Sequence, residues 1–205
     1  IHPEDRQRFF GNFARRLKGE QVDSRAEYRI IHKTGETRWV ELFSALSEND
    51  GKPVTQTVFV DISERKKAEE EIQKHSSFLN NIMEFSPFAM WIADDEGFII
   101  KTNQALRTSI NLTDKEILGA YNVLKDQNLK QQGVLPQVKE LFTKKKPTRF
   151  SIPWYADQAG AESFSKANDM WIDVSMFPVT DDKGKLLNVV CQWVDITEQK
   201  KAEEE

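Results

Sequence analysis

The strongest constraint in this sequence is an eleven-residue phrase that occurs twice. Residues 61–71 read DISERKKAEEE and residues 195–205 read DITEQKKAEEE, which agree at nine of eleven positions. Each copy follows an alternating apolar run, residues 54–60 and 187–194, and opens a charged stretch. Alternation predicts a strand and the charged stretch a helix. The recurrence therefore predicts two copies of one unit in which a strand leads directly into a helix.

The residues at these strand-to-helix junctions have the chemistry of a helix start. Ser63 and Thr197 stand at the expected N-cap, each followed by glutamate, so the hydroxyl can accept a backbone N–H while the acid meets the positive helix end. Asp61 and Asp195 end the strands, where a carboxylate can bond the first helix amides or a nearby Lys or Arg. We predict that these four residues tie each helix to its sheet. The alternative, an ordinary cap with no further role, is weakened by the duplication.

Paired strands with matching patterns precede both junctions. Residues 38–42 (RWVEL) and 170–174 (MWIDV) are followed by turn sequences at residues 49–52 and 181–185, which predicts a hairpin ending in the helix in each copy. This arrangement resembles the PAS sensor fold with its C-terminal PAC segment. In that family the final strand closes in Asp-Ile-Thr and leads to a signalling helix, so the resemblance implies a signal-junction role for the four residues above.

The second copy also contains segments that resemble the first half of this family. Residues 90–100 form a predicted hairpin, residues 103–105 open a short helix, and Thr113 with Glu116 completes the capping box of the next helix. The order and spacing of these segments carry the resemblance, which covers residues 85–198. It implies an α+β fold with a PAS-like five-stranded antiparallel sheet flanked by helices.

The first copy resembles only the later part of the family. Residues 1–6 (IHPEDR) resemble the start of its long helix, and Phe9, Phe10, Phe13 and Leu17 fall on one helical face. We expect this truncated copy to lack the first hairpin and small helices and to leave a strand edge that needs cover. Since no initiator Met is present, we also expect a longer parent protein. The predicted organisation is residues 1–61 as the C-terminal half of a first PAS domain with PAC segment, 62–84 as a connecting amphipathic helix, 85–198 as a complete PAS domain with PAC segment, and 199–205 as the start of an outgoing signalling helix.

The connecting segment has the pattern of a coiled-coil seam. It is rich in Glu, Lys and Gln, lacks Gly and Pro, and spaces its apolar positions by four and three residues in turn. The predicted dimer seam consists of Ala68, Ile72, His75, Leu79 and Ile82. It favours a homodimer, in which a sheet movement would shift two helices together. Packing of this helix on its own sheet is an equal alternative, because the seam is short and contains a polar histidine.

Strand alternation in the second copy places a set of apolar and aromatic side chains on one face. The predicted ligand cleft consists of Trp91, Ala93, Phe142, Trp154, Ile172, Val174, Met176, Cys191 and Trp193. In flavin-binding members of the family, the residue two before the strand-ending Asp faces the cleft, and here that residue is Trp193. The tryptophans suit stacking on a planar small-molecule ligand or, equally, filling the cleft, and we favour a filled core over a cofactor pocket.

Familiar cofactor and catalytic chemistries find little support. No histidine follows His75, which argues against a His-ligated haem in the complete domain. Cys191 lies in the last strand, whereas photoactive flavin members carry the reactive Cys on a helix, so cysteinyl-flavin chemistry is not expected. A noncovalent flavin or a small metabolite stays open, and the cofactor is unknown. There is no Cys and His spacing for zinc or another metal and no Gly-rich phosphate loop, so this fragment is not expected to be an enzyme.

Composition narrows the function classes further. A formal net charge of −4 gives no electrostatic reason to expect nucleic acid. The single cysteine fits a reducing, cytoplasmic compartment. No run of eighteen apolar residues is present, so we expect no membrane segment here, although a longer parent protein could be membrane-anchored.

The resemblance implies a sensory and dimerising module that couples ligand binding or partner contact to a downstream output domain. A sensor histidine kinase is the first expectation for the parent protein and a diguanylate cyclase the second. The alternative is a ligand-free interaction scaffold whose cleft is filled.

Overall fold

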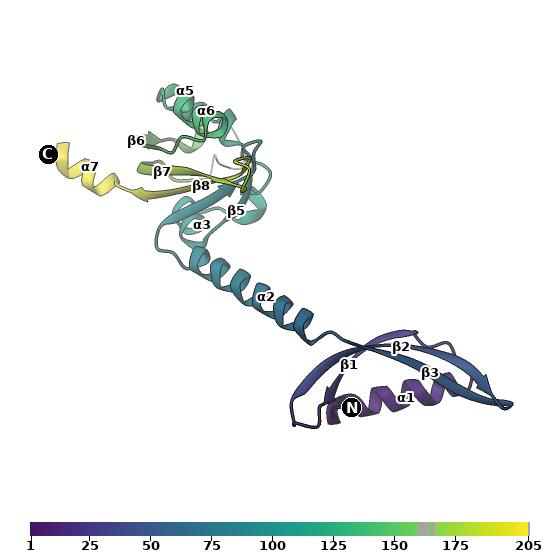
Figure 1. Ribbon diagram of the computed structural model, residues 1–205. Coiled ribbons are helices and arrows are strands. Elements are labelled where there is room, and N and C mark those ends of the chain that lie inside the picture. The colour runs from purple at the N-terminus through teal and green to yellow at the C-terminus, as the bar shows by residue number, and fades with distance from the viewer. Residues whose placement is uncertain (160–163, 165–166, 205) are drawn as a thin grey trace. The chain divides into compact units, whose positions relative to one another are not determined.

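The computed structural model describes residues 1–159, 164 and 167–204, and the chain forms two compact units, Ile1–Ser77 and Phe78–Glu205 (Figure 1). The boundary between the units falls within one helix, α2 (Ser63–Glu84). Each unit contains an antiparallel sheet. Within the described residues, no helix combines the length and apolar content needed to cross a membrane.

The first unit consists of a helix and a three-stranded sheet with the order β1-β2-β3. Its elements are η1 (Pro3–Asp5), α1 (Arg6–Leu17), β1 (Arg25–Ile31), β2 (Thr37–Asn49) and β3 (Lys52–Asp61). The β2–β3 hairpin turns at Asp50 and Gly51, which both have positive φ, 51° and 73°. Two such residues form the turn type that matches the twist of a hairpin, and this confirms the turn expected at residues 49–52.

Helix α1 packs on one face of this sheet through aromatic side chains. Phe9 meets Tyr28 edge to face, with 5.4 Å between ring centroids, over a small core that also contains Val40 and Leu42. The start of the chain is tied to β1 by Asp5, whose Oδ1 lies 2.8 Å from Nη2 of Arg29. The hydrogen bonds from Arg29 hold the pKa of Asp5 far below its usual range. The start of the chain, α1 and β1 are therefore held together by ion pairs of Arg29 with Glu4 and Asp5 and by one layer of apolar contacts.

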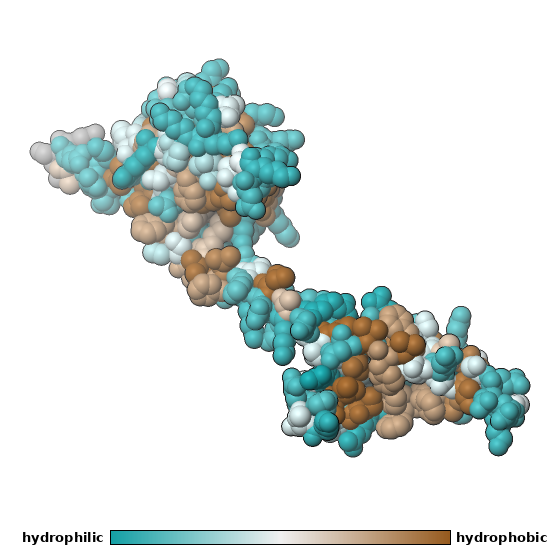
Figure 2. Space-filling view, viewed as in Figure 1, coloured by the Kyte–Doolittle hydropathy of each residue, from teal (hydrophilic) through white to brown (hydrophobic). Residues whose placement is uncertain are grey.

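The outer strand β3 has an unpaired edge. It pairs with β2, and within the described residues no other strand pairs with it. Val58, Phe59 and Val60 of this strand are 56%, 58% and 43% exposed. Figure 2 shows apolar surface over the strands of this unit. The free edge and its apolar side chains agree with the sequence-based expectation of a strand edge that needs cover.

The second unit has the five-stranded antiparallel sheet that the sequence predicts, with the order β5-β4-β8-β7-β6. Its strands are β4 (Ala89–Ala93), β5 (Ile99–Thr102), β6 (Thr148–Trp154), β7 (Met170–Thr180) and β8 (Leu186–Asp195). Its helices after α2 are α3 (Gln104–Ile110), α4 (Asp114–Ile117), η2 (Val123–Lys125), α5 (Gln127–Gln131), α6 (Leu135–Lys144), η3 (Ala156–Gln158) and α7 (Thr197–Glu204). The fold class is therefore α+β with a sheet flanked by helices, as predicted.

Local sequence signals explain where these helices begin. Thr113 and Glu116 form the predicted capping box of α4. Helix α6 begins at Leu135 and buries Val138, Leu141 and Phe142 at helical spacing against β6 and β7. The core of this unit thus lies between one sheet face and the helices that connect β5 to β6 (Figure 1).

The fully buried Asn103 joins the end of α2 to the core of the second unit. Its Oδ1 accepts hydrogen bonds from the amides of Met90 at 2.9 Å and Leu106 at 3.0 Å, the second of which caps α3. Its Nδ2 donates to the carbonyls of Met83 at 3.1 Å and Phe88 at 2.8 Å. Since an unpaired buried amide is costly, this network holds α2, β4 and α3 in one arrangement.

Candidate functional site

A cavity of about 60 Å³ lies in the core of the second unit. The sheet and the helices α3, α4 and α5 all contribute to its wall, and its lining is mainly apolar and aromatic. A cavity of about 150 Å³ accommodates benzene, and one water needs about 10–15 Å³. The cavity therefore has room for several waters or for a compound smaller than benzene. The core is therefore not completely filled, and the choice between a filled cleft and a ligand pocket stays a prediction.

Seven of the nine residues predicted for the cleft line this cavity. They are Trp91, Trp154, Ile172, Val174, Met176, Cys191 and Trp193. Burial raises the pKa of the Cys191 thiol well above its ordinary value, so this residue acts as a small apolar group in the wall. Strand alternation alone thus identifies the sheet side of the cavity.

Ala93 and Phe142 are buried but do not line the cavity, so their assignment to the cleft is wrong. Ala93 lies at the end of β4 beside Ile99, and its carbonyl accepts a hydrogen bond from Asn188. Phe142 lies on α6, which packs against β6 and β7, while the shorter helices provide the helical wall. Ala93 thus lies at the wrong position along its strand to line the cavity. Phe142 lies on a helix that does not contribute to the cavity wall.

Sequence reasoning missed the polar group of the cavity wall, Asp126. This side chain is fully buried; its Oδ1 accepts the amide of Leu129 at 2.9 Å, and its Oδ2 accepts the hydroxyl of Tyr121. Burial raises the pKa of Asp126, partly offset by these hydrogen bonds and by one from the side chain of Trp154. Asp126 is also the N-cap of α5. An aspartate three residues before a buried leucine is the cap signal that could have located it.

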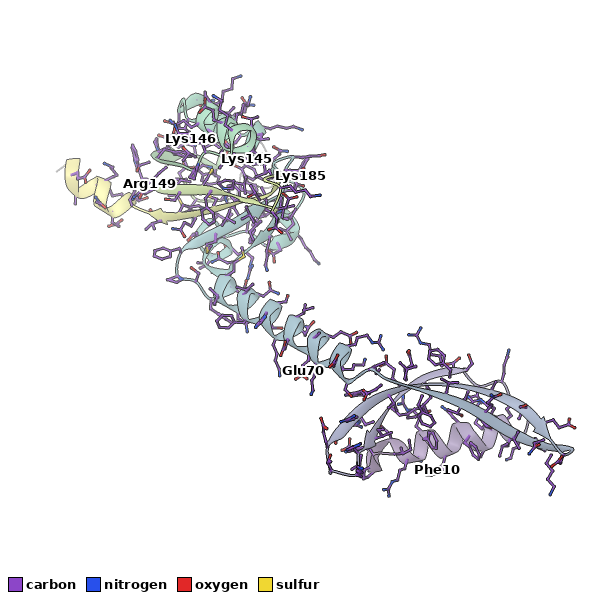
Figure 3. The ribbon with its side chains drawn as sticks, in the orientation of Figure 1. Phe10, Glu70, Lys145, Lys146, Arg149 and Lys185 are labelled. Atoms are coloured by element: carbon purple, nitrogen blue, oxygen red, sulfur yellow. The ribbon has the colours of Figure 1, made fainter. Side chains whose placement is uncertain are left out.

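Basic side chains lie elsewhere on the second unit. Within the described residues, the cavity lining contains no Lys, Arg or His. Figure 3 labels Lys145, Lys146, Arg149 and Lys185, all of which are exposed; Arg149 pairs with Asp173 at 2.6 Å. No group of three or more His, Cys, Asp or Glu side chains in the described part of the chain is arranged to hold a metal ion.

The first strand-to-helix junction differs from a simple helix cap. The carbonyl of Ile62 accepts the amide of Lys66 at 2.9 Å, so Ile62 is the N-cap and Ser63 is already inside the helix. The Ser63 hydroxyl accepts the amide of Trp39 on β2 at 3.0 Å. Asp61 behaves as expected, because its Oδ1 accepts the Ser63 amide at 2.9 Å, and this bond lowers its pKa.

The second junction repeats these contacts. Ile196 is the N-cap, because its carbonyl accepts the amide of Lys200 at 2.9 Å. The Thr197 hydroxyl accepts the amide of Trp171 on β7 at 2.9 Å and donates to Asp195 Oδ1 at 2.5 Å. The ammonium of Lys200 lies 5.8 Å from the Trp171 ring centroid, as that of Lys66 lies 5.4 Å from Trp39 in the first junction.

The prediction that Ser63 and Thr197 are the helix N-caps is therefore wrong, because Ile62 and Ile196 take that position. The strand pairing continues one residue beyond the aspartate, since the amides of Ile62 and Ile196 donate to carbonyls of the neighbouring strand. Each hydroxyl consequently reaches across to that strand instead of the helix amides. The result is a direct link between helix and sheet, present in both units.

The predicted dimer seam is uncovered. Ala68 and His75 are exposed, and Ile72, Leu79 and Ile82 are 69%, 64% and 56% exposed. The alternative, in which this face packs on its own sheet, does not describe this structure. Phe78 and Phe85, both also exposed, add apolar surface that the heptad pattern did not include.

Comparison with known proteins identifies both units. A model described as PAS fold matches residues 1–59, and a model of the PAS domain matches residues 87–198. Comparison with curated protein sequences finds no match.

Solved structures with a similar fold are distant in sequence. An RNA-binding light-oxygen-voltage receptor is 11% identical, with a TM-score of 0.51, over 98% of this chain and 84% of that one. The PAS domain of an HTR-like protein from Haloarcula marismortui is 18% identical, with a TM-score of 0.47, over 64% of this chain and 99% of that one. The LOV domain of a blue-light activated histidine kinase from Erythrobacter litoralis is 22% identical, with a TM-score of 0.44, over 54% of this chain and 97% of that one.

At these identities the likeness to solved structures concerns the fold alone. The PAS domain model, by contrast, spans more than half of the sequence. The chain therefore belongs to the PAS domain family.

Proposed function

We propose that this sensory signalling module converts occupancy of the second-unit cavity into a change in the position or stability of α7. The observation that carries the proposal is a shared strand pair. Strands β7 and β8 supply both the cavity wall and the junction contacts.

The coupling path is short. Ile172 lines the cavity, follows Trp171 directly in β7, and stands opposite Asp195 in the β7–β8 ladder. The amide of Trp171 donates to Thr197, the first residue of α7. A ligand that displaces Ile172 would therefore act on Trp171 and Asp195, the two residues that are hydrogen-bonded to the Thr197 hydroxyl. A two-state element with a gap of a few kcal/mol is repopulated by a change of similar size.

In a longer parent protein, the helix that begins with α7 would pass this change to an output domain. We expect a sensor histidine kinase first and a diguanylate cyclase second. Homodimerisation through α2 would let two such helices respond together, and the exposed seam supports it. The cavity supports a ligand-responsive module over a scaffold with a filled cleft.

The proposal is tested by filling the cavity from its wall. Val174→Ile adds one methylene group toward the space, mimicking partial occupancy, and hydrogen–deuterium exchange is measured in α7. We expect altered exchange at residues 198–201. The matched control is Val138→Ile, which adds the same group to a buried residue of α6 outside the cavity lining. Equal responses of α7 to both variants, or no response to Val174→Ile, would contradict the proposal.

A further inference from the structure

The two strand-to-helix junctions share their backbone contacts. In the first, the amide of Ile62 donates to the carbonyl of Trp39 at 2.9 Å. In the second, the amide of Ile196 donates to the carbonyl of Trp171 at 2.8 Å. The hydroxyl at the start of each helix then accepts the amide of the same tryptophan. Because this hydrogen-bond pattern is the same, equivalent positions of the two junctions can be compared side chain by side chain.

In the first junction, an acidic side chain of β1, Glu27, holds the start of α2 to the sheet. Its Oε2 lies 2.6 Å from the ammonium of Lys66, and its Oε1 lies 2.9 Å from Nη2 of Arg65. The hydrogen bond from Lys66 lowers the pKa of Glu27, as adjacent cations do to a carboxylate. We call these three residues the Glu27 cluster. It joins one strand to two consecutive cations of the helix.

Strand register locates the counterpart of Glu27 in the second unit. Glu27 stands opposite Glu41 in the β1–β2 ladder, and Ser151 stands opposite Asp173 in the β6–β7 ladder. Glu41 and Asp173 each lie two residues beyond the junction tryptophan of their strand. Ser151 is therefore the counterpart of Glu27. Its hydroxyl donates to Asp173 at 2.9 Å, and it has no charge with which to bind the helix.

The polar side chains at the start of α7 bind within the helix and not to a neighbouring acid of the sheet. Gln199 takes the place of Arg65 in the repeated phrase, and its side-chain amide donates to Glu203 at 3.1 Å. The ammonium of Lys200, the counterpart of Lys66, donates to the same glutamate at 2.7 Å. Within the described residues, no salt bridge joins α7 to a strand. The second junction therefore has the shared backbone pattern without the ion pairs.

We propose that the two junctions have different roles: the Glu27 cluster fixes the start of α2 on the first sheet, whereas α7, which has no such cluster, can open on the second. This inference deepens the proposed function and rests on it in naming α7 as the helix that responds. An exposed ion pair shifts an equilibrium by about two- to fivefold. A ligand shifts an equilibrium only by its difference in affinity for the two states, so the helix held by fewer bonds is the easier one to move.

Transfer of the cluster to the second junction tests the proposal. Ser151→Glu combined with Gln199→Arg supplies both missing charges beside Lys200. The matched control, Ser151→Gln combined with Gln199→Arg, adds side chains of the same size without the carboxylate. Hydrogen–deuterium exchange of residues 200–203 should be about two- to fivefold slower in the first variant than in the control. Equal exchange in the two variants overturns the proposal.

The reverse change is made in the first junction. Glu27→Gln removes the charge at nearly constant size, and residues 66–69 should then exchange about two- to fivefold faster. Glu48→Gln, which neutralises an exposed acid at the hairpin end of β2, should leave their exchange unchanged. Unchanged exchange after Glu27→Gln overturns the proposal, and this variant decides the question if the transferred cluster prevents folding. Each variant is compared with a control at the same helix, so the different lengths of α2 and α7 do not enter.

Addition of Val174→Ile to both second-junction variants separates this inference from the proposed function. We expect cavity filling to change the exchange of residues 200–203 in the control background and to change it less where the cluster has been transferred. If the transferred cluster slows exchange while Val174→Ile has no effect in either background, the role of the cluster stands and the proposed coupling is wrong. If the cluster leaves exchange unaltered while Val174→Ile changes it equally in both backgrounds, the coupling stands and this inference is wrong.

Discussion

Replacing Thr197 by valine removes the hydroxyl that links α7 to β7 and keeps the branched shape of the side chain. The hydroxyl accepts the Trp171 amide at 2.9 Å and donates to Asp195 at 2.5 Å. The exposed carboxylate regains water, whereas the half-buried Trp171 amide loses its partner. An unsatisfied buried donor costs about 1–3 kcal/mol, and partial exposure places this case near the lower end. We therefore expect Thr197→Val to lower the unfolding free energy by about 1–2 kcal/mol.

The measurement is urea denaturation of the full chain followed by far-ultraviolet circular dichroism. Thr197→Ser keeps the hydroxyl and should lose less than half as much stability as Thr197→Val. In the first junction, Ser63→Ala removes the equivalent acceptor of the Trp39 amide, so a loss of similar size is expected there. Stability of Thr197→Val within about 0.3 kcal/mol of the unaltered chain would refute the claim that this hydroxyl joins helix to sheet.

Three further predictions concern the cavity, the seam and acid stability. Trp193→Ala should lower the unfolding free energy by about 3–5 kcal/mol in denaturant unfolding, because the side chain is only 7% exposed and borders the cavity. Leu187→Ala, on the exposed face of β8, should cost under about 1 kcal/mol. Equal losses would contradict the assignment of Trp193 to the cavity wall. Ile72→Glu combined with Leu79→Glu should convert a dimer to a monomer in light scattering, and an unchanged mass would show that this seam does not hold two chains together. The raised pKa of Asp126 means that the folded chain binds its proton more tightly than the unfolded chain, so its contribution to stability is present below the unfolded pKa and is lost as pH rises through the folded one. Asp126→Asn should remove this loss of stability with rising pH. If the unfolding free energy of the variant varies between pH 4 and 7 as that of the unaltered chain does, the claim that Asp126 has a raised pKa is contradicted.

Much of the fold follows from local signals in the sequence. The alternation around Trp171 and Trp193, the turn at Asp50 and the capping box at Thr113 each depend on residues close in the chain. The repeated Asp-Ile-Ser/Thr phrase then aligns two units without any knowledge of tertiary contacts. Such features are predictable because strand period, turn geometry and helix capping act over a few residues.

The features that sequence reasoning missed depend on long-range packing. Asp126 is recognisable as a cap, but its place in a cavity wall requires the positions of three helices and the sheet. Phe142 does not line the cavity, and only the packing of α6 on β6 and β7 shows this. The role of Thr197 was misjudged because the strand ladder continues by one residue beyond Asp195.

The central claim, that the cavity communicates with α7 through the Thr197 hydroxyl, is tested most directly by a double-mutant cycle. Hydrogen–deuterium exchange of residues 198–201 is compared in the unaltered chain, Val174→Ile, Thr197→Val and the double variant. Interaction between contacting sites appears as non-additivity, usually about 0.5–3 kcal/mol. The account predicts that filling the cavity changes α7 exchange when the hydroxyl is present and has little effect when it is absent. If Val174→Ile alters α7 exchange equally in both backgrounds, the hydroxyl is not the element that transmits the change.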